Sequence, residues 1–433
     1  MYKHILIFIF CLSAAAWQLN AQVAKPRKGT FALTNATIET INNGIVRGTL
    51  LIQDGKIAAL GANVTPPAGA EIFDCNGLTL YPGMIDGGTQ IGLSEVSSVS
   101  LTEDYSEIGD IIPHMEALTA VNPNGAAIAV TRVSGVTTAL TMPQSGLFPG
   151  TAALINLVGY TPDQMYAGFK TVIMSYPSGG RRGFWDQRSE EDIKKEVERT
   201  QKKMNEVWDQ AVLYAKIDSA AQKDKSIKIE YNPEMATLAK VVRGEMSLMI
   251  EVNKSDDILA AIKWVQDQKI KKVIFAGVAE GWRVADQIAK SGIPVVAGPV
   301  QAIPTRPSDR YDSRYANPGI MAKAGVKVAL RTSESENVRN LPFHAGFAAA
   351  YGMGKEAALR AVTIVPAQIF GVDKMLGSLE VGKSATLFAA TGDPFETKTQ
   401  VRYLFIDGYL VPLDSRHIQL YDEFLNRATG VQK

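Results

Sequence analysis

Strand-like and helix-like runs of hydrophobic residues divide the chain into two end segments and a long middle. Short runs rich in β-branched and apolar residues lie at both ends, and turn signals such as Asp54-Gly55 and Asp407-Gly408 follow them. The pattern predicts strands at residues 30–38, 48–53, 56–59, 385–390 and 401–406. Because these β-rich ends flank a different kind of pattern, we expect them to form one small β-sandwich from residues 22–79 and 376–433.

The middle of the chain, residues 80–375, alternates apolar strand-like runs with helical patterns. Alternation of this kind favours parallel βα units. Seven strands are predicted, at residues 80–85, 137–141, 169–174, 248–252, 272–275, 293–296 and 326–330. A (β/α)₈ barrel takes about 250 residues, so the middle is long enough for one, although the pattern does not reveal an eighth strand.

A long charged segment at about residues 189–222 interrupts this alternation. Ser189 followed by Asp192 is typical of a helix start, because the serine hydroxyl can cap the backbone N–H three residues on. We expect a helical insertion between two units of the middle domain. Its face rich in Glu, Lys and Arg should lie in solvent or against a partner.

Residues 1–21 have the pattern of a secretory signal peptide. Lys3 precedes a mostly apolar run, and Leu19-Asn20-Ala21 fits a cleavage site. The apolar run is too short to span a bilayer, so we expect a secreted or periplasmic protein, cleaved after Ala21, without a membrane span. Cys75 would then be the sole cysteine and no internal disulfide could form. The formal net charge of +1 gives no sign of a nucleic-acid partner.

One short motif points to a family. Residues 82–90 are Pro-Gly-Met-Ile-Asp-Gly-Gly-Thr-Gln. This segment resembles the first barrel strand of the amidohydrolase superfamily, whose signature is Pro-Gly-(apolar)-Ile-Asp-x-His-x-His. Similar motifs follow in the family's order at residues 135–138, 255–258 and 377–383, and the nearest branch is imidazolonepropionase- and prolidase-like. The resemblance implies a TIM-type (β/α)₈ barrel with a small β-sandwich, and metal-dependent hydrolysis of non-peptide or dipeptide-like C–N amide bonds.

The resemblance also implies where the metal ligands should lie. Family members carry two histidines on strand one, a histidine each on strands five and six, and an aspartate on strand eight. The expected positions in this chain hold Gly88, Gln90, Glu251, Asn253, Ala276 and Ser333. Zinc prefers His, Cys and carboxylate ligands. We therefore expect no metal cofactor, and zinc or another divalent ion only if the site is atypical.

Other polar residues could still take part in catalysis or binding. Asp86, His114 and Glu251 are the catalytic candidates: Glu251 could act as a general base, and His114 lies in a loop expected at the barrel mouth. Each also has a structural alternative, which is a strand-end hydrogen bond for Asp86, an ion pair for Glu251 and simple packing for His114. The candidates for ligand binding are Gln90, Lys170, Asn253, Arg331 and Ser333.

Three functions are compatible with these observations. The first is a weakly active or non-catalytic protein that binds a small amide or peptide-derived ligand, as a homo-oligomer or with an active paralogue in a hetero-oligomer. The second is an active amidohydrolase with an atypical metal or metal-independent site. The third is a structural role resting on residues 189–222. The missing metal ligands favour the first.

Overall fold

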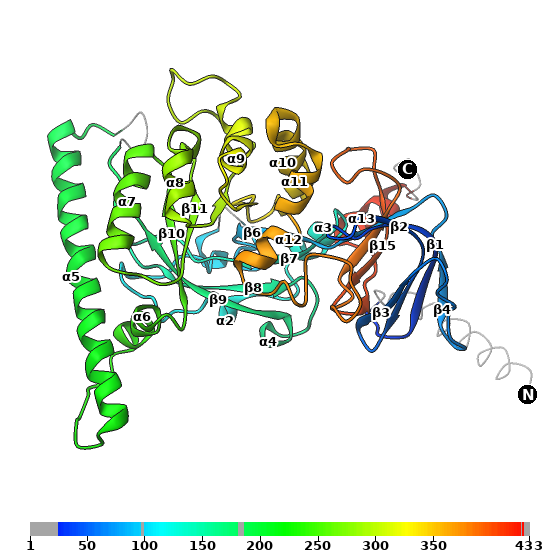
Figure 1. Ribbon diagram of the computed structural model, residues 1–433, viewed down its shortest axis with the longest axis horizontal. Coiled ribbons are helices and arrows are strands. Elements are labelled where there is room, and N and C mark those ends of the chain that lie inside the picture. Colours follow the sequence, from blue (N-terminus) through cyan, green and yellow to red (C-terminus); the bar gives the residue numbers. More distant parts are fainter. Residues whose placement is uncertain (1–24, 97–98, 181–185, 426, 428–433) are drawn as a thin grey trace, which may run out of the picture.

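The computed structural model describes residues 25–96, 99–180, 186–425 and 427. The predicted signal peptide, residues 1–21, lies outside these described residues. Two eight-stranded sheets organise the described chain. One comes from the middle of the chain and the other from its two ends, and Figure 1 shows them at opposite sides of the molecule. The predicted fold, a barrel with a smaller β-rich unit built from both chain ends, is confirmed.

The barrel sheet follows the order of the sequence from β6 to β13. Its strands are β6 (Met84–Thr89), β7 (Val136–Thr141), β8 (Gly150–Asn156), β9 (Tyr166–Ser175), β10 (Ser247–Val252), β11 (Val273–Gly277), β12 (Val295–Ala297) and β13 (Val328–Leu330). Backbone hydrogen bonds join its two ends: Ser333 N donates to Gly88 O at 3.0 Å, and Gln90 N donates to Glu334 O at 3.0 Å. The residues that follow β6 and β13 therefore meet at the mouth of the barrel.

The prediction missed β8, and the expectation of parallel units throughout is wrong there. β8 pairs antiparallel with both β7 and β9, whereas β9 to β13 pair parallel. The sequence of β8, Gly-Thr-Ala-Ala-Leu-Ile-Asn, contains Gly, Ala and Asn, which are depleted in strands, so its strand signal is weak. Antiparallel neighbours also need no crossover helix, so the alternation that reveals the other strands is absent here.

The two ends of the chain share the small sheet, in the order β16-β15-β14-β5-β1-β2-β3, with β4 beside β1. Its strands are β1 (Phe31–Glu39), β2 (Ile45–Gln53), β3 (Lys56–Gly61), β4 (Glu71–Asp74), β5 (Thr79–Pro82), β14 (Leu387–Ala390), β15 (Val401–Ile406) and β16 (Tyr409–Leu410). Asp54 and Gly55 turn the chain between β2 and β3 with positive φ angles of 52° and 76°. Asp-Gly is the pair that such a tight hairpin turn favours.

The predicted strand at residues 80–85 is in fact divided between the two sheets. β5 pairs with β1 and β14 in the small sheet, and β6 begins at Met84 in the barrel. Gly83 stands at the break, where a Cβ atom would lie 2.1 Å from Oγ1 of Thr137. The backbone can pass this close to Thr137 only because residue 83 has no side chain.

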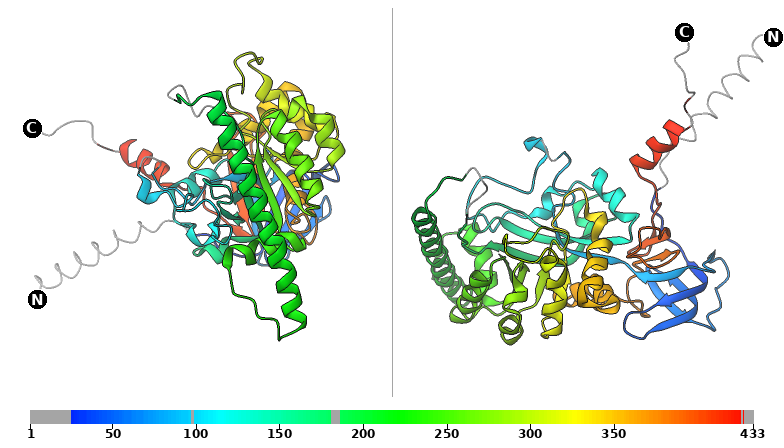
Figure 2. Two further views of the ribbon diagram at one scale, coloured as in Figure 1. Left: turned by 90° about the vertical axis from the view of Figure 1, so that its left-hand side faces the viewer. Right: turned by 90° about the horizontal axis from the view of Figure 1, so that it is seen from above.

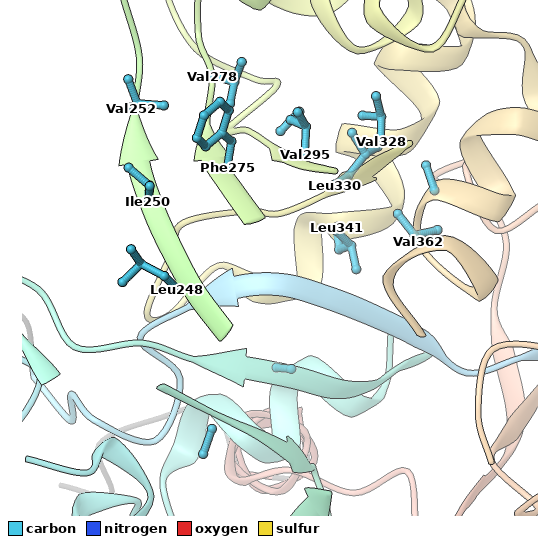
Figure 3. Close-up of a cluster of buried hydrophobic side chains, with 14 of the residues drawn as sticks. Leu248, Ile250, Val252, Phe275, Val278, Val295, Val328, Leu330, Leu341 and Val362 are labelled. Carbon is cyan, nitrogen blue, oxygen red and sulfur yellow. The ribbon is translucent and has the colours of Figure 1, made fainter. Parts of the chain in front are cut away.

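Side chains along each barrel strand alternate between the barrel interior and the surrounding helices. On β10, Leu248, Ile250 and Val252 belong to the large apolar cluster of Figure 3, whereas Met249 belongs to the separate cluster inside the barrel. Glu251 lies two positions after Met249 and therefore shares its face. The alternation thus turns Glu251 inward at the end of β10.

Helices surround much of the barrel, and the longest is α5 (Figure 1). The α-helices of the described chain are α2 (Ala117–Ala120), α3 (Ala126–Arg132), α4 (Pro162–Met165), α5 (Glu190–Lys223), α6 (Pro233–Arg243), α7 (Ser255–Asp267), α8 (Ala285–Ser291), α9 (Ser313–Lys323), α10 (Leu341–Ala348), α11 (Lys355–Ala361), α12 (Ile364–Ile369) and α13 (Arg416–Leu425). The predicted helix start is confirmed, because Ser189 Oγ accepts a hydrogen bond from Asp192 N at 3.1 Å. Figures 1 and 2 place α5 at the end of the barrel away from the small sheet.

No helix within the described ranges combines the length and the apolar character needed to cross a bilayer.

Candidate functional site

A pocket of about 600 Å³ lies at the C-terminal end of the barrel strands, the face where active sites of this fold are found. This volume falls within the range of about 300–1,000 Å³ that is usual for small-molecule sites. We call it the mouth pocket. Five of the predicted site residues line it together: Gln90, Glu251, Asn253, Arg331 and Ser333. Much of the remaining wall is apolar and includes Met142, Pro143, Pro149, Ile173 and Pro304.

An ion pair between Glu251 and Arg331 lies in the mouth pocket. Arg331 Nη2 is 2.6 Å from Glu251 Oε1, and the two side chains are 7% and 28% exposed, respectively. Asn253 Nδ2 also donates to Glu251 Oε1, at 3.3 Å. Gly277 makes room for both acceptors, because a Cβ atom there would lie 2.5 Å from Glu251 Oε1 and 2.4 Å from Asn253 Oδ1. Glu251 is therefore a paired carboxylate in this arrangement.

The Arg331 side chain fills the space beside Gly88. A Cβ atom on Gly88 would lie 3.0 Å from Arg331 Cδ and 2.6 Å from Met142 Sδ. A Cβ atom on Gly298 would likewise lie 3.0 Å from Arg331 Cγ. By its resemblance to the family, position 88 is one where relatives carry a metal-binding histidine. A guanidinium group therefore lies beside the position where the resemblance implies a metal-binding imidazole.

Asp86 lies beneath the mouth pocket and is fully buried. Its carboxylate accepts hydrogen bonds from Gly88 N at 3.0 Å and from Thr332 Oγ1 at 2.6 Å, and Thr332 N contacts both oxygens at 3.2 Å. Burial raises the pKa of Asp86 to about 7, although these hydrogen bonds and the charge of Arg331 favour the ionised form. Because Thr332 follows β13, the contacts of Asp86 help to close the barrel.

Ser333 takes an unusual conformation at the edge of the mouth pocket. Its φ angle is +59°, in the left-handed region that non-glycine residues seldom adopt. Its Oγ atom is buried and has no hydrogen-bond partner among the described residues. Strained backbone and unpaired polar groups concentrate at ligand sites, so Ser333 is a strong candidate for ligand contact.

Besides Asp86, two of the predicted site residues, Lys170 and His114, lie outside the mouth-pocket lining. Lys170 lies two positions before Val172 on β9 and therefore shares its face, and Val172 belongs to the large apolar cluster outside the barrel interior. The Lys170 Nζ atom is 2.6 Å from Glu116 Oε2. His114 follows buried Pro113, and its Nδ1 atom is buried without a partner among the described residues. Neither residue lines the mouth pocket, so a ligand bound there would not contact their side chains.

The sequence analysis missed Arg314, which lines the mouth pocket from the first turn of α9. Arg314 Nη2 donates to Pro299 O at 2.9 Å. Burial, and after it the charge of Arg331, lowers the pKa of Arg314, while Glu251 opposes this shift. Arg314 has no family motif around it, but it follows the loop after β12, and such βα loops form the active-site face of a barrel.

The residues at the expected metal-ligand positions do not fit a divalent metal. Gly88 and Ala276 offer no donor atom, and Gln90 and Asn253 offer neutral amides. Glu251 is bound to Arg331, whose positive charge would repel a cation. Within the described residues, no group of three or more His, Cys, Asp or Glu side chains could hold a metal ion. The donor chemistry of the mouth pocket thus disagrees with the metal that the family implies.

Comparison with known proteins places this architecture in a family. The sequence profile of the Amidohydrolase family matches residues 79–411. The chain therefore belongs to the amidohydrolase family. None of the curated proteins matches it in sequence.

Several solved structures share the fold. An amidohydrolase from Thermotoga maritima MSB8 is 25% identical, with a TM-score of 0.79, and the alignment covers 88% of this chain and 99% of that one. A prolidase complexed with N-methylphosphonate-L-proline is 15% identical, with a TM-score of 0.55 and coverage of 88% and 99%. Molinate hydrolase is 16% identical, with a TM-score of 0.57 and coverage of 94% and 99%.

Proposed function

We propose that this chain uses the amidohydrolase barrel as a metal-independent binding site for a small amide or peptide-derived ligand. One observation carries the proposal: the Arg331 side chain packs against Gly88 and pairs with Glu251. A fixed cation then takes the place of a metal ion, and Glu251, the one carboxylate among the described residues of the pocket wall, neutralises it. The reaction of the family, which depends on metal-activated water, has no counterpart among these groups.

The ligand class follows from the family and from the size of the pocket. One solved neighbour is a prolidase holding N-methylphosphonate-L-proline, and another is a Xaa-Pro dipeptidase with bound methionine. Amide side chains of Gln90 and Asn253 line the mouth pocket and can donate to or accept from an amide group. The apolar prolines around them would accept a hydrophobic side chain of the ligand.

A second candidate function is an active hydrolase with an atypical site. Glu251 favours it, because this carboxylate lies on the pocket wall and keeps 28% of its side chain exposed. A water molecule activated by Glu251 could attack a bound amide. Arg331 would have to release Glu251, at least in part, for the carboxylate to act as a base.

We also propose that the protein is exported. The support is the signal-peptide pattern of residues 1–21. Cell fractionation and N-terminal sequencing test it: a periplasmic or secreted chain beginning at Gln22 is expected, and an intact Met1 on a cytosolic chain would reject it. We propose in addition that the protein associates with itself or with an active paralogue. Light scattering of the purified protein tests self-association.

Metal analysis tests the central proposal. The purified protein is loaded with zinc and manganese, desalted and examined by inductively coupled plasma mass spectrometry. We expect far less than one equivalent of either metal. Stoichiometric metal that is lost in Glu251→Ala, and kept in the control Asp267→Ala, would overturn the proposal. Asp267 suits the control because its side chain is 58% exposed and lies on α7, where it pairs with Lys263.

Activity assays separate the two candidate functions. N-acyl amino acids and dipeptides are incubated with the protein, with and without added zinc, and the products are followed by mass spectrometry. Binding without turnover supports the metal-independent binding protein. Turnover that disappears in Glu251→Gln would support the hydrolase instead.

A further inference from the structure

The charged groups of the mouth pocket do not balance. Three ionisable side chains line it: Glu251, Arg314 and Arg331. Glu251 is bound to Arg331 at 2.6 Å. Arg314 forms no ion pair among the described residues, and its hydrogen bond goes to the neutral carbonyl of Pro299. Among the described residues that line the pocket, cationic side chains therefore outnumber anionic ones by one.

This excess charge sits where water cannot fully compensate it. Arg314 is largely buried, and burial lowers its pKa, but a guanidinium group stays protonated in proteins. A buried charge without a partner is unfavourable. An anion bound beside Arg314 would supply the missing partner.

Two further donors, on residues that line the same pocket, lack acceptors among the described residues. The Ser333 Oγ and Arg331 Nε atoms are buried and have no hydrogen-bond partners among the described residues. The Arg331 guanidinium uses Nη2 for Glu251. Ser333 follows Arg331 by two residues and has a strained backbone, with a φ angle of +59°. A serine hydroxyl and an arginine fork together form a typical receptor for a carboxylate.

We infer that the ligand of the mouth pocket carries a carboxylate, bound between Arg314 and Arg331 with a hydrogen bond from the Ser333 hydroxyl. This inference rests on the proposed function and narrows its ligand class to amide or peptide-derived acids. Glu251 keeps Arg331 in place and leaves Arg314 to neutralise the ligand. The amides of Gln90 and Asn253 then face the amide group of the ligand, and the proline-rich wall accepts its side chain.

Matched acids and amides test the inference. Each N-acetyl amino acid with an apolar side chain is compared with the corresponding N-acetyl amino acid amide, which differs only in lacking the negative charge. Binding to the full chain is measured by isothermal titration calorimetry. We expect the best acid to bind about tenfold or more tightly than its amide. Equal or tighter binding of the amide, or no binding of any acid, would overturn the inference.

Arginine variants locate the binding charge. Arg314→Met should weaken binding of the acid by about tenfold or more and change binding of the amide by less than about twofold. Arg310→Met is the matched control, because Arg310 lies four residues earlier with a side chain that is 81% exposed and pairs with Asp312. The control should alter neither affinity. An equal loss of both ligands in Arg314→Met would indicate a role in structure alone and reject the inference.

Ser333 offers a test in which folding and binding move in opposite directions. Ser333→Gly relieves the strain of the positive φ angle and should stabilise the fold, yet it should weaken acid binding several-fold because the hydroxyl is lost. Unchanged acid affinity would exclude Ser333 from the carboxylate site. If amides bind as well as acids while the protein holds no metal, the carboxylate inference fails and the proposed function stands. Stoichiometric metal would instead refute the proposed function.

Discussion

The Arg331–Glu251 pair can be tested by removing each partner in turn. Arg331→Met leaves the Glu251 carboxylate without its cation, and Glu251→Gln leaves the buried guanidinium without its anion. Breaking a buried ion pair costs about 3–5 kcal/mol, whereas an exposed pair contributes about 0.2–1 kcal/mol. Arg331 is nearly buried but Glu251 is 28% exposed, so each single variant should lose about 2–3 kcal/mol of unfolding free energy.

The double variant determines how much of that loss belongs to the pair. When both charges are removed, no uncompensated charge is left, and the methionine introduced by Arg331→Met can pack against Met142 and Gly88. The double variant should therefore lose about 2 kcal/mol, giving a coupling energy of about 2–4 kcal/mol in magnitude. The assay is urea unfolding of all four proteins at pH 7, followed by circular dichroism. The coupling should change little with added salt, because a buried pair is weakly screened.

Additive losses would refute this reasoning. A coupling energy below about 0.5 kcal/mol is the value expected for independent sites, and it would mean that Arg331 and Glu251 do not pair. The fixed cation beside Gly88 would then lose its support, and with it the argument for a metal-independent pocket.

Three further predictions concern the neighbouring groups and the small sheet. Burial raises the pKa of Asp86 to about 7. Its contribution to the unfolding free energy is therefore fully present below about pH 4 and is lost as the pH rises through about 7, at up to about 1.4 kcal/mol per pH unit. In urea unfolding between pH 5 and pH 7, the unfolding free energy of Asp86→Asn should lack this pH dependence, and equal slopes for the two proteins would contradict the prediction. Gly88→Ala should destabilise the protein by about 1–3 kcal/mol in the same assay through overpacking, because the added Cβ atom would meet Met142 Sδ and Arg331 Cδ. An unchanged unfolding free energy would show that the space beside Gly88 is open. Cys75 is fully buried, and burial raises the pKa of its thiol to about 12. In a Cys11→Ser background, the native protein should therefore not react with a thiol reagent at pH 8 until it is unfolded. Rapid labelling of the native chain would contradict the packing of the small sheet.

The sequence predicted most of the elements, because strand and helix patterns depend on near neighbours. Alternation placed seven of the barrel strands near their observed positions, and the strands at 401–406 and 48–53 overlap β15 and β2. The strand β8 was not predicted because its residue types are depleted in strands and because its antiparallel pairing needs no crossover helix. The division of residues 80–85 at Gly83 was not predicted because both halves of this segment are apolar. The two halves differ only in the sheet with which each one pairs.

The sequence alone also determined which side chains stand at the positions where the resemblance implies metal ligands. Position 88 holds glycine and position 90 holds glutamine in any fold, and neither side chain supplies an imidazole. By resemblance, these substitutions were enough to predict that the metal ligands are lost. One sequence is enough for that prediction because the prediction depends on residue types and not on which side chains are in contact.

Only the tertiary structure decided what surrounds these positions. Arg331 and Glu251 are 80 residues apart, and Asp86 and Thr332 are 246 residues apart. Closure of the barrel brings these groups together, and no local pattern encodes such distances. Closure also placed Arg314 in the pocket and left Lys170 outside its lining. Residue identities thus determine which donors are available, whereas packing across the barrel determines which of them form ion pairs, hydrogen bonds and a common pocket.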